Sequence, residues 1–196
     1  MRRTLGVLLA AGMAAALFAL PVWAASSPSK LIETVGVRVA EIVKTKTGID
    51  REAAIRQVLH DTLDFPYMGR MVLGAHWNEA SAEQRARSLA AVESSEARAY
   101  SERLGRYAGY TMIVDRVIAR TNGEWIVESR LNMAGGEPIK LEWEVHDSGQ
   151  GMRIADVKIA GVSMFLTRRA EFDSYIQKNG GKVEPLVAAL EARASR

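Results

Sequence analysis

The spacing of apolar residues changes twice along this chain, and these changes restrict the folds that it can adopt. Up to about Leu104, apolar residues recur every three or four positions, as in amphipathic helices. After Gly105 they alternate with polar residues at a period of two, as in strands with one covered face. From Met164 the helical period returns. Helices, then consecutive strands, then helices again predict an α+β domain.

The helical parts divide at residues that start or stop helices. We expect a first helix between the polar stretch 26–29 and a C-cap at Gly48, and a second helix capped by Asp50. Ser81 and Gln84 have the spacing of a capping box, which opens a long helix that ends near Leu104. The other predicted helical segments are 65–77, Met164–Lys178 and Val183–Ala194, with Asn179, Gly180 and Gly181 between the last two.

The alternating part predicts a four-stranded, curved antiparallel sheet. Turn signals at 121–123, 135–136 and 148–151 separate its runs. Helices that cover the apolar face of such a sheet can enclose a cavity, although periodicity alone does not separate a lined cavity from an ordinary packed core. The inward-facing residues expected from the alternation include Trp125, Val127, Leu131, Leu141, Trp143, Val157 and Ile159.

The first residues have the layout of a cleaved secretory signal. A basic start is followed by an apolar run from Leu5 to Leu20, and Val22 and Ala24 have the small side chains that cleavage requires. We therefore expect a signal peptide at 1–24 and a single domain at 25–196 that works outside the cytoplasm. The alternative is a retained anchor, for which the apolar run is near the short limit.

Composition excludes several partners and anchors. Ala25 stands where a lipoprotein has its lipid-bearing cysteine, and the chain contains no cysteine at all. Removing Arg2 and Arg3 with the signal leaves 24 basic and 23 acidic residues, a formal charge of +1. The basic residues are scattered and match no nucleic-acid-binding module, so we expect no nucleic-acid partner.

Few residues suggest catalysis. The histidines His60, His76 and His146 lack metal-ligand spacing, and no Gly-x-Ser-x-Gly turn occurs. His60 and Asp64, four residues apart, could pair on a helix face. The strand parity of Asp156 favours a solvent-facing residue over a general base. We therefore expect a binding protein without catalytic residues, metal or cofactor.

Residues 64–77, Asp-Phe-Pro-Tyr-Met-Gly-Arg-Met-Val-Leu-Gly-Ala-His-Trp, resemble the signature of the MlaC (toluene-tolerance) family of periplasmic phospholipid-binding proteins. The family has Asp-Phe, Met, Arg, Leu-Gly and Trp at this spacing, followed by a Glu-Gln-Arg helix as at 83–85. Residues 156–163 resemble its strand-to-helix junction. Further matches at Arg169, Phe172, Ile176 and the 180–181 glycine pair extend the resemblance over nearly the whole mature chain.

One segment is similar to a narrower branch. Leu-Thr-Arg-Arg at 166–169 stands where the phospholipid carriers tend to have Asn-Tyr-Arg, and residues 162–172 are similar to HpnM, a family member associated with hopanoid lipids. The ligand implied is therefore either a phospholipid or a hopanoid.

The resemblance implies a carrier that encloses acyl chains in a deep apolar cavity and catalyses no reaction. It also implies partners, namely an inner-membrane ABC-type lipid transport complex and an outer-membrane lipoprotein complex. Arg70 and Arg169 could meet a phosphate head group or serve as structural ion-pair partners. As the helical part of the lining we add Met68, Met71, Val72 and Met164 to the sheet residues named above.

Two other classes of function stay open at this point. An enzyme acting on a polycyclic lipid would need an ionisable group among the inward residues, and the strand parity supplies none. A structural adaptor would fill its core with side chains, so a cavity would count against it.

Overall fold

The computed structural model describes residues 27–105, 109–132 and 136–195. The predicted signal peptide at 1–24 lies outside these residues, as does Gly135 of one turn signal. The helices are α1 (Pro28–Thr45), α2 (Gly48–Thr62), α3 (Phe65–Leu73), α4 (His76–Glu79), α5 (Ala82–Leu104), α6 (Met164–Lys178) and α7 (Glu184–Ala194). The strands are β1 (Thr111–Ala119), β2 (Glu124–Asn132), β3 (Ile139–Asp147), β4 (Met152–Ile159) and β5 (Val162–Ser163).

The strands form one antiparallel sheet in the order β1-β2-β3-β4-β5. The predicted α+β class is confirmed, but the described sheet has five strands and the prediction of four was wrong. The additional β5 pairs only two residues with the end of β4. A strand of that length shows no alternation in the sequence.

Most predicted helix boundaries agree with the structure, but two predictions were wrong. The segment 65–77, predicted as one helical segment, is divided into α3 and α4 because Gly74 ends α3. The junction of the first two helices also differs. Ser27 caps α1 by accepting a hydrogen bond from the backbone of Lys30, and α5 opens with the predicted capping box. The prediction for the junction was wrong, because Gly48 begins α2 and Asp50 lies within its first turn. Lys46 is already extended, so α1 ends before the glycine is reached.

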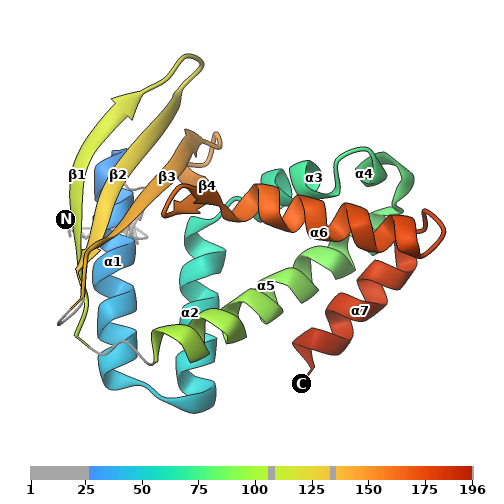
Figure 1. The fold of residues 1–196 in the computed structure, drawn as a ribbon, viewed down its shortest axis with the longest axis horizontal. Helices are drawn as coiled ribbons and strands as arrows, with labels where there is room; N and C mark the ends of the chain where they lie inside the picture. Colours follow the sequence, from blue (N-terminus) through green and yellow to red (C-terminus); the bar gives the residue numbers. More distant parts are fainter. Residues whose placement is uncertain (1–26, 106–108, 133–135, 196) are drawn as a thin grey trace, which may run out of the picture.

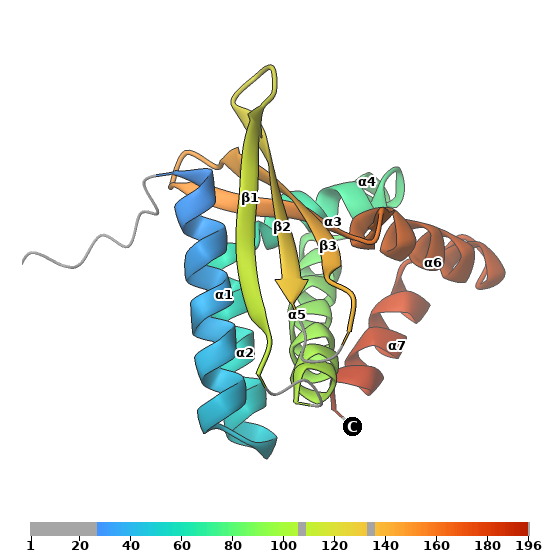
Figure 2. The ribbon, with the colours of Figure 1, turned by 60° about the vertical axis from the view of Figure 1, so that its left-hand side comes forward.

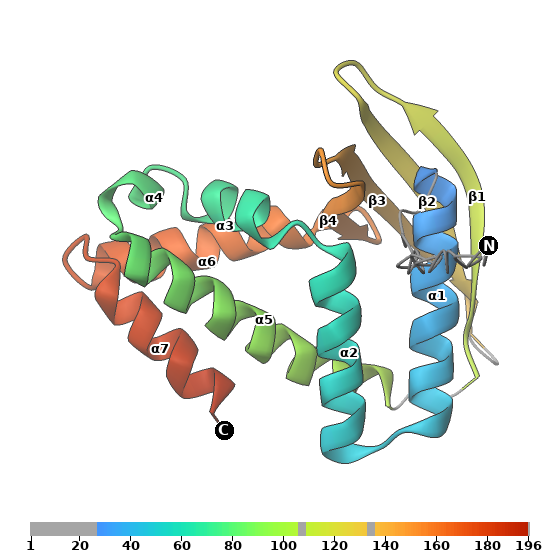
Figure 3. The same ribbon diagram turned by 180° about the vertical axis from the view of Figure 1, so that it is seen from behind.

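Helices cover one face of the sheet and extend beyond its edge. Helix α1 packs along the sheet, α2 lies beside α1, and α5 packs against both α2 and α7 (Figures 1 and 3). Figure 2 shows β2 and β3 in front of α5, with α1 beside β1. Helices α3 and α6 lie side by side and extend away from β4.

The buried apolar residues form two clusters. One joins α1 and α2 to the sheet and contains Ile32, Val127 and Val145. The other joins α3, α5, α6 and α7 and includes Phe172 and Val187. This division of the core leaves a region that both clusters border, where the candidate site lies.

Candidate functional site

A cavity of about 490 Å³ lies between the sheet and five helices. Its wall is largely apolar, and residues of both core clusters contribute to it. The apolar lining residues are Val35, Val39, Ile55, Val58, Leu59, Leu63, Phe65, Met68, Val72, Leu73, Leu89, Val92, Leu104, Leu131, Ile139, Leu141, Trp143, Ile154, Val157, Ile159, Met164, Phe165 and Phe172.

The periodicity of each element explains why these side chains converge. On α3, Phe65, Met68 and Val72 are three or four residues apart and therefore share one face of the helix. On β3, Ile139, Leu141 and Trp143 are two apart and share one face of the strand. The indole of Trp143 is held in place because its Nε1 donates a hydrogen bond of 2.8 Å to the buried Ser129 hydroxyl.

Most of the residues that the sequence indicated lie in this wall. Their role in ligand binding stays a prediction, because their position alone shows no contact with a ligand. The residues concerned are Met68, Val72, Leu131, Leu141, Trp143, Val157, Ile159 and Met164.

The remaining predicted residues lie elsewhere. Val127 is fully buried in the cluster with α1, and Trp125 pairs across the sheet with Val145 of that cluster. Strand parity identifies the covered face of a sheet but not the part of that face that a helix fills. On α3, Met71 and Arg70 lie outside the stripe that lines the cavity, and both are exposed.

The long helices also contribute to the wall, and the sequence did not predict this. Leu89, Val92 and Tyr100 of α5 and Val39 of α1 line the cavity, as does Phe165 of α6. Their helical spacing was visible in the sequence. That spacing indicates a covered helix face and does not tell whether another side chain or an open space covers it.

An ion-pair network interrupts the apolar wall. Arg168 of α6 pairs with Glu96 of α5, and its Nη1 lies 2.7 Å from Glu171 Oε2. All three residues line the cavity, so the network links α5 to α6 at its edge. Tyr100 lies close by, and its pKa is raised by burial first and by the charge of Glu96 second.

The prediction that Asp156 faces solvent was wrong. This carboxylate is 5% exposed and accepts hydrogen bonds from the Ser163 hydroxyl and from the backbone N–H of Phe165 at 2.9 Å. A β-bulge next to it shifts the register between β3 and β4, and the start of α6 covers it. The backbone N–H of Val157 is a third donor to this carboxylate. These three hydrogen bonds hold the strand-to-helix junction, so Asp156 is not free to act as a base.

The suggested His60–Asp64 pair does not form. His60 lies 3.2 Å from Glu93, whereas Asp64 Oδ2 lies 2.9 Å from His146 Nε2. The cause is that α2 ends at Thr62, so the two residues do not share a helix. Asp64 instead caps α3 through its other oxygen and thereby joins α3 to the sheet.

Tyr110, at the start of the sheet, is another polar residue of the wall. It is 8% exposed, and its hydroxyl is buried without a hydrogen-bond partner among the described residues. Burial raises its pKa to about 12. The hydroxyl thus contributes an unfavourable desolvation free energy to the folded state.

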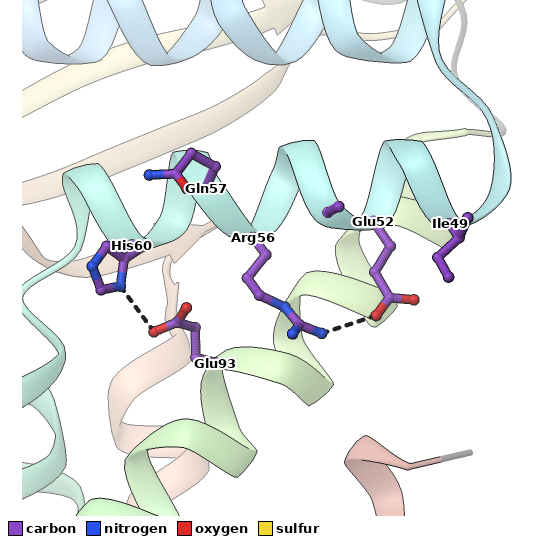
Figure 4. Close-up of a pocket in the computed structure, with 7 residues that line it drawn as sticks. Ile49, Glu52, Arg56, Gln57, His60 and Glu93 are labelled. Atoms are coloured by element: carbon purple, nitrogen blue, oxygen red, sulfur yellow. Dashed lines mark hydrogen bonds and ion pairs between the residues drawn. The ribbon is translucent and has the colours of Figure 1, made fainter.

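A second hollow, of about 430 Å³, lies between α2 and α5 (Figure 4). Most of its lining residues are polar or charged, and its charged groups already have partners. Arg56 pairs with Glu52 at 3.1 Å, and His60 pairs with Glu93. Since this hollow presents neither a continuous apolar wall nor a free charge of one sign, the larger cavity is the better candidate site.

Within the described ranges, no group of three or more His, Asp or Glu side chains is placed to hold a metal ion. The same part of the chain contains no helix with the length and hydropathy needed to span a membrane.

Comparison with known proteins now gives the family. The model of the MlaC protein family matches residues 33–192. The chain belongs to the MlaC protein family. A phospholipid-binding protein from Ralstonia solanacearum, whose structure was solved in complex with a phospholipid, has the same fold, with a TM-score of 0.74. It is 23% identical, and the match covers 84% of this chain and 95% of that protein. None of the curated protein sequences matches this chain.

The residues that carry the MlaC resemblance at 64–77 have structural roles here. Asp64 caps α3 and holds His146. Gly69 lets α3 approach α5, since a Cβ there would lie 2.2 Å from a methyl group of Leu89. Gly74 ends α3 with a φ of 54°, which favours glycine. The motif therefore fixes the helix that closes one side of the cavity.

Proposed function

We propose that this chain is a periplasmic carrier that holds the apolar part of a lipid in the cavity between its sheet and helices. The supporting observation is an apolar cavity in a chain of the MlaC family. The neighbour of the same fold that was solved with a phospholipid gives further support. An adaptor with a filled core would not need such a space.

The size of the cavity suits a lipid chain. At about 30 Å³ for each water-sized group, 490 Å³ accommodates on the order of 16 such groups, or at least one long acyl chain. Each buried methylene contributes about 0.8 kcal/mol, so that one chain gains roughly 13 kcal/mol relative to water. A wall of this kind therefore offsets most of the cost of removing an acyl chain from a bilayer.

We further propose that the lipid moves between an inner-membrane ABC-type complex and an outer-membrane lipoprotein complex. The predicted signal peptide supports a place of action between these membranes. Binding and release would drive each step, because the described residues present no constellation for covalent chemistry.

A hopanoid is the second candidate ligand, and one observation favours considering it. Thr167 and Arg168, in the segment that resembles the hopanoid-associated branch, line the cavity. A substitution there would change the wall that a rigid polycyclic lipid contacts.

Transfer of labelled phospholipid between donor and acceptor vesicles tests the proposed function. The protein should accelerate transfer, and excess unlabelled phospholipid should compete with the labelled lipid. If only a hopanoid competes, the second candidate is supported. If the protein accelerates transfer of neither lipid, the carrier function is refuted.

A further inference from the structure

Two arginines share one indole on the surface of α3–α5. The guanidinium carbon of Arg70 lies 5.9 Å from the ring centroid of Trp77, and that of Arg85 lies 5.0 Å from it. Among the described residues neither arginine has a carboxylate within ion-pair distance. Because neither guanidinium is paired with an acid in that part of the chain, the two like charges produce a local positive field.

A third arginine extends this positive field onto α6. The guanidinium of Arg169 lies against Gly74 at the end of α3, where an added Cβ would be 3.3 Å from Nη2. No acidic partner of Arg169 occurs in the described ranges either. The nearby acids, Glu79 and Asp173, are both bonded to His76. Three guanidinium groups thus gather where α3, α4 and α6 meet.

Exposed apolar side chains accompany these charges. Met71 on α3 is 38% exposed, and Leu166, one turn before Arg169 on α6, is 60% exposed. The other faces of the same two helices line the cavity through residues such as Met68 and Met164. Figures 1 and 3 show α3 and α6 side by side, so one pair of helices carries the cavity wall and the exposed residues.

We propose that the α3–α6 face, defined by Arg70, Met71, Arg85, Leu166 and Arg169, docks on the anionic head groups of a lipid bilayer. Arginine matches a phosphate with two parallel hydrogen bonds, and apolar side chains among basic ones enter the interfacial region of a membrane. Docking would bring the wall of the cavity against the bilayer. The docking surface does not depend on which lipid the cavity holds.

Co-sedimentation of the purified protein with vesicles tests this proposal. The protein should bind vesicles in which half of the lipid is phosphatidylglycerol, bind pure phosphatidylcholine vesicles much less, and lose binding as salt is added. Each basic residue at an anionic surface contributes roughly fivefold, so Arg70→Gln with Arg169→Gln should weaken binding about 25-fold. The matched control, Lys44→Gln with Arg120→Gln, removes two exposed charges elsewhere and should change binding less than about twofold.

Native mass spectrometry of the same samples reports the lipid held in the cavity, so a failure of docking and a failure of carriage are distinguished. Equal binding of the double variant and the wild type would overturn the proposal, as would equal weakening by the control pair. Binding to a membrane protein but not to protein-free vesicles would also overturn it, because the face would then be a protein interface.

Discussion

Replacing Leu141 by aspartate would place a carboxyl group in the apolar wall of the cavity. Leu141 is 8% exposed and lies on β3 opposite Ser129 and Ile159. In the lipid-free protein, water in the cavity can solvate the carboxylate. An acyl chain displaces that water, so the variant should bind lipid more weakly than the wild type.

The loss of lipid affinity in Leu141→Asp has an upper limit. The carboxyl group can take up a proton when lipid binds, and its charge is then not desolvated. Protonating an ordinary aspartate at pH 7 costs about 4 kcal/mol, at 1.36 kcal/mol for each pH unit above its pKa. The charge alone therefore weakens binding by at most about 1,000-fold. The neutral variant Leu141→Asn carries no charge to desolvate. Its free energy of lipid binding should be less favourable than that of the wild type by only about 1–3 kcal/mol.

The lipid affinity of Leu141→Asp should increase as the pH falls. Lipid raises the pKa of the introduced carboxyl group, so the penalty is complete above the raised pKa and disappears as the pH falls toward about 4. Between these limits the ratio of the Asn and Asp variants' affinities should change about tenfold for each pH unit.

Titration with a fluorescent phospholipid at several pH values measures these affinities. Leu186→Ala is the control for lost stability, because Leu186 is 3% exposed in the α5–α7 cluster and does not line the cavity. It should destabilise the protein without changing its affinity for lipid. Equal affinities of the Asn and Asp variants at pH 7, with both folded, would refute the reasoning.

Three further predictions concern stability. Tyr110→Phe removes a buried hydroxyl that has no hydrogen-bond partner among the described residues. It should raise the free energy of unfolding in urea by about 1–3 kcal/mol, and a decrease would contradict this. Ser163→Ala removes a helix cap and a partner of buried Asp156, and should lower it by about 1–3 kcal/mol, whereas no change would contradict the assigned role. The pKa of His76 is raised, chiefly by its bond to Glu79, so its stabilisation is complete below pH 6.5 and is lost as the pH rises. His76→Gln should therefore destabilise the protein more at pH 5.5 than at pH 8, and a reversed order would refute the assignment.

The sequence was most informative where local signals mark boundaries. Helix α6 begins and ends at the predicted residues, because Ser163 caps its start and a turn at Asn179 and Gly180 follows its end. The capping box of Ser81 and Gln84 was likewise confirmed. These signals depend on residues within one turn of each other and therefore survive without knowledge of the tertiary fold.

The predictions that were wrong concern contacts between distant segments of the chain. The burial of Asp156 depends on a bulge and on the helix that folds over it, and neither leaves a local signal. The partner of Asp64 is 82 residues away in the sequence. Val127 has the same parity as the cavity residue Trp143, yet α1 covers it. Alternation therefore predicts the face of a residue, whereas neighbouring helices decide between core and cavity.

The central claim is that the cavity holds lipid, and native mass spectrometry of the protein purified without detergent tests it most directly. Solvent extraction then identifies the bound molecule. A stoichiometric phospholipid is the predicted result, and a hopanoid would support the second ligand class. A mass equal to that of the protein alone, unchanged after incubation with phospholipid or hopanoid vesicles, would contradict the account.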